Sequence, residues 1–225
     1  MRKKLRNRLI VWVAILVVIG LVALLRPGPE DRFISQLKSK DVQKRLAAID
    51  GLKSIGSNRA WDAIATQTDD ANVQVATHAI HALGGVFRKS TVAVIAKGLE
   101  DSRAAIRQAS LVSLARCSRR LVRPTLIVDL LAKETEPNVR AAGFQAAGGL
   151  IIWDAMPILV ASLRDENRWV RLQAAKAIQK ILGVNHGFNA DDPVDKREKV
   201  IKSIEAQWPS FKDAVEGFLK RLEAK

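Results

Sequence analysis

Aromatic residues and cysteine are scarce in this chain. Only 5% of its 225 residues are aromatic and tyrosine is absent, whereas 48% are hydrophobic. Because β-strands favour aromatic and β-branched residues, this composition favours helix pairs lined by Ala, Leu and Val over a sheet. The single cysteine, Cys117, cannot form an internal disulfide, and we expect it to be a small buried hydrophobe rather than a functional thiol.

Catalytic motifs are also missing. The sequence has no glycine-rich phosphate loop, no nucleophile elbow and no Cys-x-x-Cys pair. His78 and His81 share a helix face and could supply two metal ligands, but no third or fourth ligand stands near them in the pattern. We therefore predict no catalytic residue, no cofactor and no metal site, and we predict that the protein is not an enzyme.

What the chain does contain is a repeated phrase, clearest from Leu163 to Gly183. There Asp165 and Asn167 can cap a helix start, and apolar residues then recur on one helix face at Val170, Ala174, Ala177, Ile178 and Ile181. Aligned on Arg171, the phrase recurs in steps of 31, 31, 33 and 31 residues at Arg45, Ala76, Arg107 and Arg140. A fixed period of this size predicts a solenoid.

The phrase resembles HEAT repeats, in particular the short type of the phycobilin lyases. An acidic residue stands six positions before the arginine in the pairs Asp101/Arg107, Glu134/Arg140 and Asp165/Arg171. The resemblance implies that these side chains form a ladder of contacts between neighbouring repeats. Ser39 and Ala76 depart from the pattern, so we expect a weaker ladder in the first two repeats.

The expected fold is therefore all-α: a right-handed α-solenoid of about five HEAT-like helix pairs over residues 31–183. The outer helices are expected near 33–37, 60–66, 91–99, 125–131 and 156–163. After Gly183 the period stops, and residues 184–225 are predicted to form a helical cap. This cap would have one helix from Pro193, with a stripe at Ile201, Ile204 and Trp208, and after Pro209 a second stripe at Phe211, Ala214, Val215, Phe218 and Leu222.

The N-terminus combines a basic and an apolar segment. Residues 1–8 carry five positive charges and no negative one, and residues 9–25 are uncharged and include Trp12. At about 1.5 Å per residue, the uncharged run spans about 25 Å as a helix, the short end of a membrane span. A cleaved signal peptide has a similar start, but this run is longer than a usual signal core and residues 21–23 make a poor cleavage site.

We therefore expect an uncleaved transmembrane helix over 9–25, a cytoplasmic segment over 1–8 and a stiff linker over 26–30. The charge bias then predicts a single-pass protein of the cell (inner) membrane with a cytoplasmic N-terminus and the solenoid on the outer, periplasmic side.

The rest of the chain is also basic. Residues 26–225 hold 32 Lys and Arg against 23 Asp and Glu, since all five charges of the first 25 residues are positive, which leaves a net charge of +9. This surplus could attract anionic lipid or an acidic partner, or be an ordinary solvated surface. The densest cluster outside the N-terminus, a candidate for phosphate or carboxylate binding or a solvated loop, is Arg116, Arg119, Arg120 and Arg123.

Two alternative functions follow from HEAT-like relatives. The alkyl-purine DNA glycosylases grip DNA with a basic concave face and aromatic residues, and Trp153 and Trp169 could play such parts beside the arginines. The predicted export makes nucleic acid an unlikely partner, and for Trp169 packing against the helix-entry loop is the simpler interpretation. A lyase or hydrolase accessory enzyme rests on family analogy alone.

The leading functional hypothesis concerns the inner-helix face that points away from the core. Positions −3, +1, +5 and +8 from the aligned arginine lie there, and in repeats two to four none of them is charged: Val73, Thr77, His81, Gly84, Ala104, Gln108, Val112, Ala115, Pro137, Ala141, Gln145 and Gly148. We predict a non-catalytic, membrane-tethered scaffold that binds a protein segment on this concave face, with contacts at His81, Gln108, Val112, Gln145, Arg168 and Lys176. Alternatively, the small residues pack against neighbouring repeats.

Overall fold

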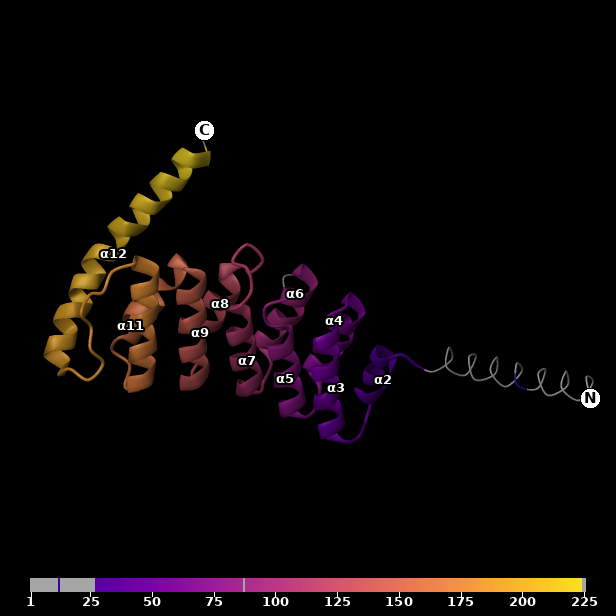
Figure 1. The fold of residues 1–225 in the computed structure, drawn as a ribbon. Coiled ribbons are helices and arrows are strands. Elements are labelled where there is room, and N and C mark those ends of the chain that lie inside the picture. Colours follow the sequence, from indigo (N-terminus) through magenta and orange to yellow (C-terminus); the bar gives the residue numbers. More distant parts are fainter. Residues whose placement is uncertain (1–11, 13–26, 87, 224–225) are drawn as a thin grey trace, which may run out of the picture.

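The computed structural model describes Trp12 and residues 27–86 and 88–223, with side chains described as far as residue 214. Every regular element in these residues is a helix, and the helices follow one another along an elongated molecule in chain order (Figure 1). The prediction of an all-α solenoid is confirmed. Each helix contacts helices of its own repeat and of the adjacent repeats, most extensively between inner helices, so the core runs as a continuous layer along the molecule.

Five helix pairs make up the body of the solenoid. The outer helices are α2 (Pro29–Gln36), α4 (Asn58–Ala65), α6 (Lys89–Lys97), α8 (Pro124–Leu131) and α10 (Met156–Ser162). The inner helices, which stack side by side, are α3 (Val42–Ile55), α5 (Val73–Leu83), α7 (Ala104–Leu114), α9 (Pro137–Leu150) and α11 (Arg168–Leu182). Three 3-10 turns lie at ends of outer helices: η1 (Thr66–Asp69), η2 (Gly98–Glu100) and η3 (Trp153–Ala155).

Local sequence signals set the helix boundaries. The side chains of Asp41, Asn72 and Asn167 accept hydrogen bonds from backbone N–H groups at the starts of α3, α5 and α11. Proline occupies the first turn of four helices, where no helical N–H is lost. Gly56 and Gly183 end α3 and α11 in the left-handed conformation that glycine adopts without strain, at φ 66° and 71°. The linker predicted over 26–30 is shorter, because its last two residues form the first turn of α2.

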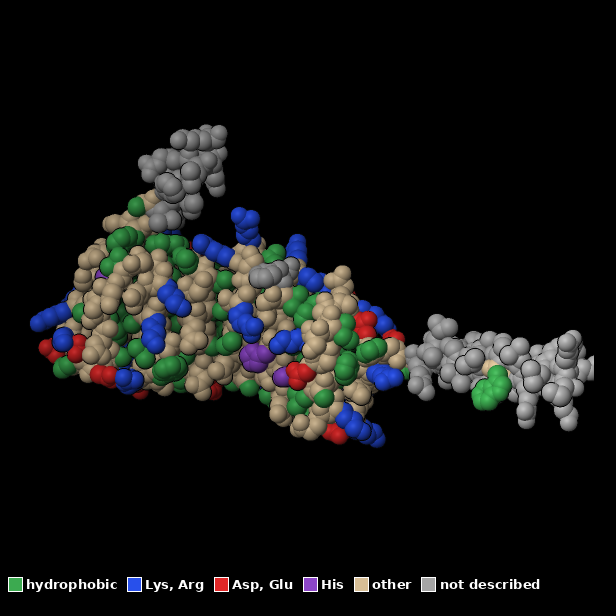
Figure 2. All heavy atoms as spheres, viewed as in Figure 1, with side chains coloured by type: hydrophobic (Ala, Val, Ile, Leu, Met, Phe, Trp, Pro, Cys, Tyr) green, Lys and Arg blue, Asp and Glu red, His purple; other side chains and the backbone are tan. Residues whose placement is uncertain are grey.

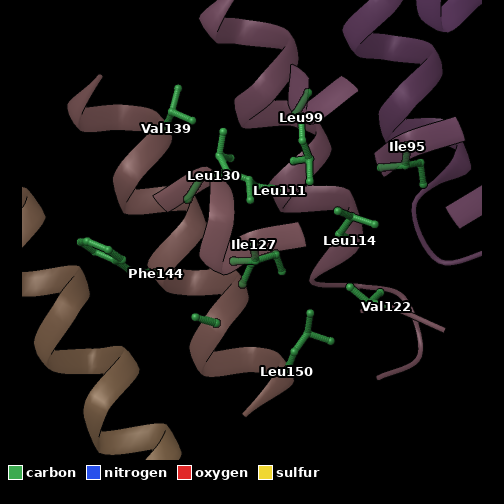
Figure 3. Close-up of a cluster of buried hydrophobic side chains, with 14 of the residues drawn as sticks. Ile95, Leu99, Leu111, Leu114, Val122, Ile127, Leu130, Val139, Phe144 and Leu150 are labelled. Carbon is green, nitrogen blue, oxygen red and sulfur yellow. The ribbon is translucent and has the colours of Figure 1, made fainter. Parts of the chain in front are cut away.

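The core lies between the outer and inner layers. In the third and fourth repeats, aliphatic side chains from both layers interdigitate around α8 (Figure 3). Phe144 is fully buried there, and the Arg140 guanidinium lies 5.7 Å from the centre of its ring. Burying a side chain of this size contributes about 2–3 kcal/mol, so the repeats are held mainly by apolar packing.

The C-terminal segment forms one helix where we expected two. Helix α12 (Val194–Glu223) continues through Pro209, and its direction changes along its length (Figure 1). Proline removes one helical hydrogen bond, and the exposed position of this turn lets water solvate the freed carbonyl group. The first half of α12 packs on the fifth repeat through Ile201 and Ile204, and Arg164 binds Glu198 at 2.6 Å and Glu205 at 2.8 Å.

The predicted localisation is wrong. Among the residues that the structure describes, none of the helices has both the length and the apolar character needed to cross a bilayer, which contradicts a single-pass membrane protein with its solenoid on the outer side. The predicted span over 9–25 lies outside the described residues except for Trp12. The physical weakness of that prediction was its length, since about 25 Å is below the usual thickness of about 30 Å.

Candidate functional site

A ladder of ion pairs runs along one edge of the solenoid, where the inner helices begin. Arg45 binds Asp70 at 2.8 Å, Arg107 binds Glu134 at 2.7 Å, and Arg140 binds Asp165. Each pair joins an arginine to the carboxylate of the next repeat. The arginines of the first, third and fifth repeats also donate to the carbonyl group six residues earlier in their own repeat, at 2.7–2.9 Å.

The carboxylates of this ladder also stabilise the loops that precede the inner helices. Asp70, Asp101 and Asp165 each accept a hydrogen bond from the backbone N–H two residues later, at 2.7–2.8 Å. Glu134 accepts from the N–H groups of Thr135 and Glu136. One acidic side chain therefore fixes both the start of its own helix and the distance to the preceding repeat.

The ladder is interrupted at one place, which differs from the weakening expected in the first two repeats. The Arg45–Asp70 pair is formed although Ser39 lacks a carboxylate, because the partner acid comes from the next repeat. The second repeat has Ala76 where the other repeats have the ladder arginine. Arg103 of the third repeat links these two repeats instead. It binds the Asp101 carboxylate at 2.7 Å and donates to the carbonyl group of Asp70 at 2.9 Å. The last ladder arginine, Arg171, binds the carbonyl oxygen of Ala190.

The pKa values of the ladder groups reflect these contacts. Burial by itself would raise the pKa of Glu134, but hydrogen bonds from the Arg107 guanidinium and from backbone N–H groups lower it below 4.5. Hydrogen bonds from Arg103 lower the pKa of Asp101 below 3.8. Hydrogen bonding to Glu134 raises the pKa of Arg107, so this pair is charged over the whole physiological range.

The twelve concave-face positions fall into two groups. Gly84, Ala141 and Gly148 are buried, and they lie where neighbouring inner helices meet. A Cβ added at Gly84 would lie 3.0 Å from the Ser113 side chain, and one added at Gly148 would lie 2.8 Å from the Ala177 Cα. These small residues pack against the next repeat. The other nine positions are exposed or half-buried, among them Gln108 and Gln145.

A depression of about 790 Å³ crosses the C-terminal ends of α7, α9 and α11. We call it the inner groove, and it is lined by Ala115, Gln145, Gly149, Gln173, Lys176, Ala177, Gln179, Lys180 and Gly183. On its floor the Gln145 amide donates to the side-chain oxygen of Gln173 at 3.1 Å. A smaller cavity of about 200 Å³ lies between α11 and the C-terminal segment, and Lys176 and Gln179 line both cavities.

The six predicted contact residues do not all reach this groove. Gln145 and Lys176 line it. Gln108 is exposed and has no hydrogen-bond partner among the described residues, and Val112 is half-buried against the core. His81 lies near Ser113, with its Nδ1 at 3.4 Å from the hydroxyl oxygen. Arg168 lies at the opposite end of α11, where it is paired with Asp191.

The predicted anion-binding arginines lie beyond the end of α7. Arg116, Arg119, Arg120 and Arg123 are all exposed, and none has an acidic partner among the described residues. Partial burial, the charge of Arg116 and that of His78 lower the pKa of His81, so Arg116 also acts on the end of α5. On the face shown in Figure 2, basic side chains lie over the middle and along the upper and lower edges, and acidic ones lie along the lower edge and at the right-hand end of the body.

The other residues singled out from the sequence have packing or pairing roles. His78 binds Asp50 at 2.8 Å, and the described residues bring no three His, Cys, Asp or Glu side chains together as metal ligands. Trp153 packs against the core, whereas Trp169 is 45% exposed at the start of α11, away from the inner groove. Cys117 is buried and its thiol contacts the carbonyl group of Ser113.

Sequence reasoning missed Gln173 and Lys180. Gln173 is buried and pairs across helices with a residue at a different repeat position, so no single-repeat pattern marks it. Lys180 lies in the last turn of α11, where a basic residue is a common helix-end signal and says nothing of a groove.

Comparisons with known proteins agree with this architecture. A family model for HEAT repeats matches residues 124–187. No curated protein matches the sequence. The fold is similar to a chain of the CpcE–CpcF complex of phycocyanin lyase from Nostoc sp. PCC7120, with a TM-score of 0.58 and 21% identity over 71% of this chain and 66% of that one.

Two further structures share the fold at lower identity. The MAST/Orbit N-terminal domain is 17% identical, with a TM-score of 0.51 over 81% of this chain and 100% of that one. A designed armadillo repeat protein in complex with the peptide (KR)4 is 18% identical, with a TM-score of 0.50 over 78% and 87%. The family match and these structural likenesses support a HEAT-like repeat protein.

Proposed function

We propose that this protein is a non-catalytic scaffold that binds an extended polypeptide segment across its inner helices. The observation that carries the proposal is the inner groove, whose floor offers side-chain amides and small residues on three successive helices. Such a floor can receive a backbone closely and pair with its N–H and C=O groups. Protein binding is also in keeping with two solenoids of similar fold, one a subunit of a two-protein complex and one bound to a peptide.

The glutamines have the hydrogen-bonding capacity that this function needs. Gln145 uses its N–H₂ group on Gln173, so its side-chain oxygen is available to accept from a peptide N–H. Gln108, one helix earlier, has both amide groups free among the described residues. Gln108 does not line the groove, but it is exposed on the neighbouring helix α7, so a chain that extends from the groove across α7 can use both amides.

Peptide arrays would test the proposal. Ten-residue peptides of varied composition would be probed with the full chain and with a Gln108→Ala/Gln145→Ala variant, and the bound peptides would be measured in solution by fluorescence anisotropy. We expect at least a fivefold weaker affinity for the double variant. Gln36→Ala, an exposed glutamine on outer helix α2, is the matched control and should bind like the wild type.

Peptides that bind the wild type and the Gln108→Ala/Gln145→Ala variant with equal affinity would contradict this use of the groove. Gln36→Ala should melt like the wild type, whereas the double variant should melt slightly lower because Gln145→Ala removes the donor to the buried Gln173. Affinities are therefore compared at a temperature at which all three proteins are folded. A catalytic role is not supported by the described side chains, and the likeness to a lyase chain concerns the fold alone.

A further inference from the structure

The charged side chains beside the inner groove are arranged differently from those of the ladder. At the edge where the inner helices begin, the ladder pairs each arginine with a carboxylate or a carbonyl group, and Arg168 is paired with Asp191. Side chains of both signs that are unpaired among the described residues also lie at this edge, including Lys40, Lys44, Glu100 and Glu136. Farther along the helices, three acids have partners. Asp62 binds Arg88, Asp154 binds Lys212 and Asp50 binds His78.

Six basic side chains that follow α7 or lie in the second half of α11 have no acidic partner among the described residues. We call them the basic edge: Arg116, Arg119, Arg120, Arg123, Lys176 and Lys180. Lys176 and Lys180 line the inner groove itself, and Arg116 directly follows Ala115, another lining residue. The basic edge therefore reaches the groove at α11 through Lys176 and Lys180 and at the end of α7 through Arg116.

We propose that the segment bound in the inner groove is acidic, with carboxylates directed toward the basic edge. This inference rests on the proposed peptide-binding function and names the chemistry of its ligand. Unpaired Lys and Arg side chains in and beside a groove without acidic lining residues attract carboxylates and suppress basic competitors. Arginine adds bidentate hydrogen bonds to carboxylates, which fix the orientation of the bound chain.

Helix spacing gives the length of the segment. Neighbouring helices pack about 9 Å apart, so the two steps from α7 to α11 span about 18 Å, which about five extended residues would cover at about 3.4 Å each. Side chains of an extended chain alternate between two sides. Acidic residues at alternate positions would therefore all point toward the basic edge.

Nucleic acid is a less suitable occupant of this surface. Single strands bind through basic groups interleaved with aromatic platforms on which bases stack. The described residues that line the inner groove include no aromatic side chain. The exposed Trp169 lies at the other end of α11. The groove floor presents amides, which match a peptide backbone.

The test uses three ten-residue peptides that differ only at alternate positions, which carry Glu, Gln or Lys. Affinities would be measured for the full chain, for Lys176→Glu/Lys180→Glu and for Lys40→Glu/Lys44→Glu. The last variant changes net charge equally but lies at the start of α3, at the opposite edge. We expect the Glu peptide to bind at least tenfold more tightly than the Lys peptide, and to lose at least tenfold in affinity only with the first variant.

Each other outcome has a defined meaning. Equal losses in both variants would show a general charge effect and overturn the inference. If the Gln peptide binds as well as the Glu peptide and depends on Gln145, the groove function stands and the acidic preference falls. If no peptide binds, the proposed function itself falls. A ten-nucleotide oligothymidylate that binds more tightly than the Glu peptide would overturn the peptide ligand in favour of a nucleic acid.

Discussion

Adjacent glycines on α9 have opposite environments although the sequence gives no sign of it. A Cβ at Gly148 would meet the backbone of α11, with the Ala177 Cα at 2.8 Å, whereas a Cβ at Gly149 would have nothing within 4 Å. The same substitution at the two positions therefore separates helix propensity from interhelix packing.

We predict that Gly148→Ala destabilises the protein and that Gly149→Ala does not. Overpacking costs about 1–3 kcal/mol, which exceeds the gain of up to about 1 kcal/mol from replacing a helical glycine with alanine. The Gly149→Ala variant should be more stable by about 0.5 kcal/mol, since only the propensity gain applies. Urea titration of both variants measures these changes, and a stabilised Gly148→Ala would show that α9 and α11 separate easily.

A second residue-scale prediction concerns Arg103, which replaces the arginine missing at Ala76. Arg103→Asn removes its contacts with Asp101 and with the Asp70 carbonyl, and we expect a loss of about 1–2 kcal/mol. Ala76→Arg alone should also destabilise, because Ala76 is fully buried. The double variant restores the regular ladder. Its loss of stability should therefore be smaller, by about 1 kcal/mol or more, than the sum of the losses of the two single variants. Additive losses of stability in this cycle would mean that Arg103 does not substitute for an arginine at position 76.

At the scale of the helix, the contacts between repeats depend on carboxylates that are easier to ionise in the folded state. The pKa of Glu134 is lowered from 4.5, so the stability that it contributes is fully present above pH 4.5 and is lost as the pH falls through its folded value. Its side chain is only 4% exposed, which limits screening by solvent.

We predict that Glu134→Gln costs about 2 kcal/mol near neutral pH, and that this difference shrinks as the pH falls below 4.5. The uncharged glutamine retains the shape but cannot form the ion pair with Arg107. Denaturant titrations at pH 7, 5, 4 and 3 would follow the difference. The exposed Glu100→Gln serves as the control and should change stability little at any pH. A difference that stays constant from pH 7 to pH 3 would assign the role of Glu134 to packing.

The helices could be predicted from the sequence because their signals are local. Asp41, Asn72 and Asn167 mark helix starts, Gly56 and Gly183 mark ends, and the apolar period gives the buried face. The pairing of Gln145 with Gln173 and the replacement role of Arg103 could not, because they depend on how neighbouring helices are staggered. Pro209 does not end the cap helix, because the turn that it interrupts is exposed and water can solvate the freed carbonyl group.

At the scale of the whole molecule, α12 closes the end of the core that no sixth repeat covers. Ile201 and Ile204 are buried against the fifth repeat, and Arg164 adds two ion pairs with partly exposed partners. Such exposed pairs contribute little, at about 0–1 kcal/mol each, so the two isoleucines should dominate the docking of α12.

We predict that Ile201→Ala/Ile204→Ala releases the C-terminal segment while the preceding repeats stay folded. Buried Ile→Ala changes cost about 2–5 kcal/mol each, and stacked repeats can open one by one from an end. Limited proteolysis should then cut the chain after Gly183 much faster than in the wild type. Arg168→Ala, which removes an exposed ion pair with Asp191, is the control and should leave the cleavage rate unchanged. Equal cleavage of the double variant and the wild type would show that α12 is held by other contacts.

The order of the repeats along the chain also determines when the end of the fifth repeat, which α12 covers, becomes buried during synthesis. Each inner helix packs on the one made before it, so the repeats can fold in turn as the chain leaves the ribosome. The outer end of the fifth repeat is covered only when α12, with Ile201 and Ile204, has been made. At about 5–20 residues per second, the 42 residues from 184 to 225 take about 2–8 seconds to add. During those seconds the newest repeat presents an apolar surface to the cell, and a chaperone that binds nascent chains would find it there.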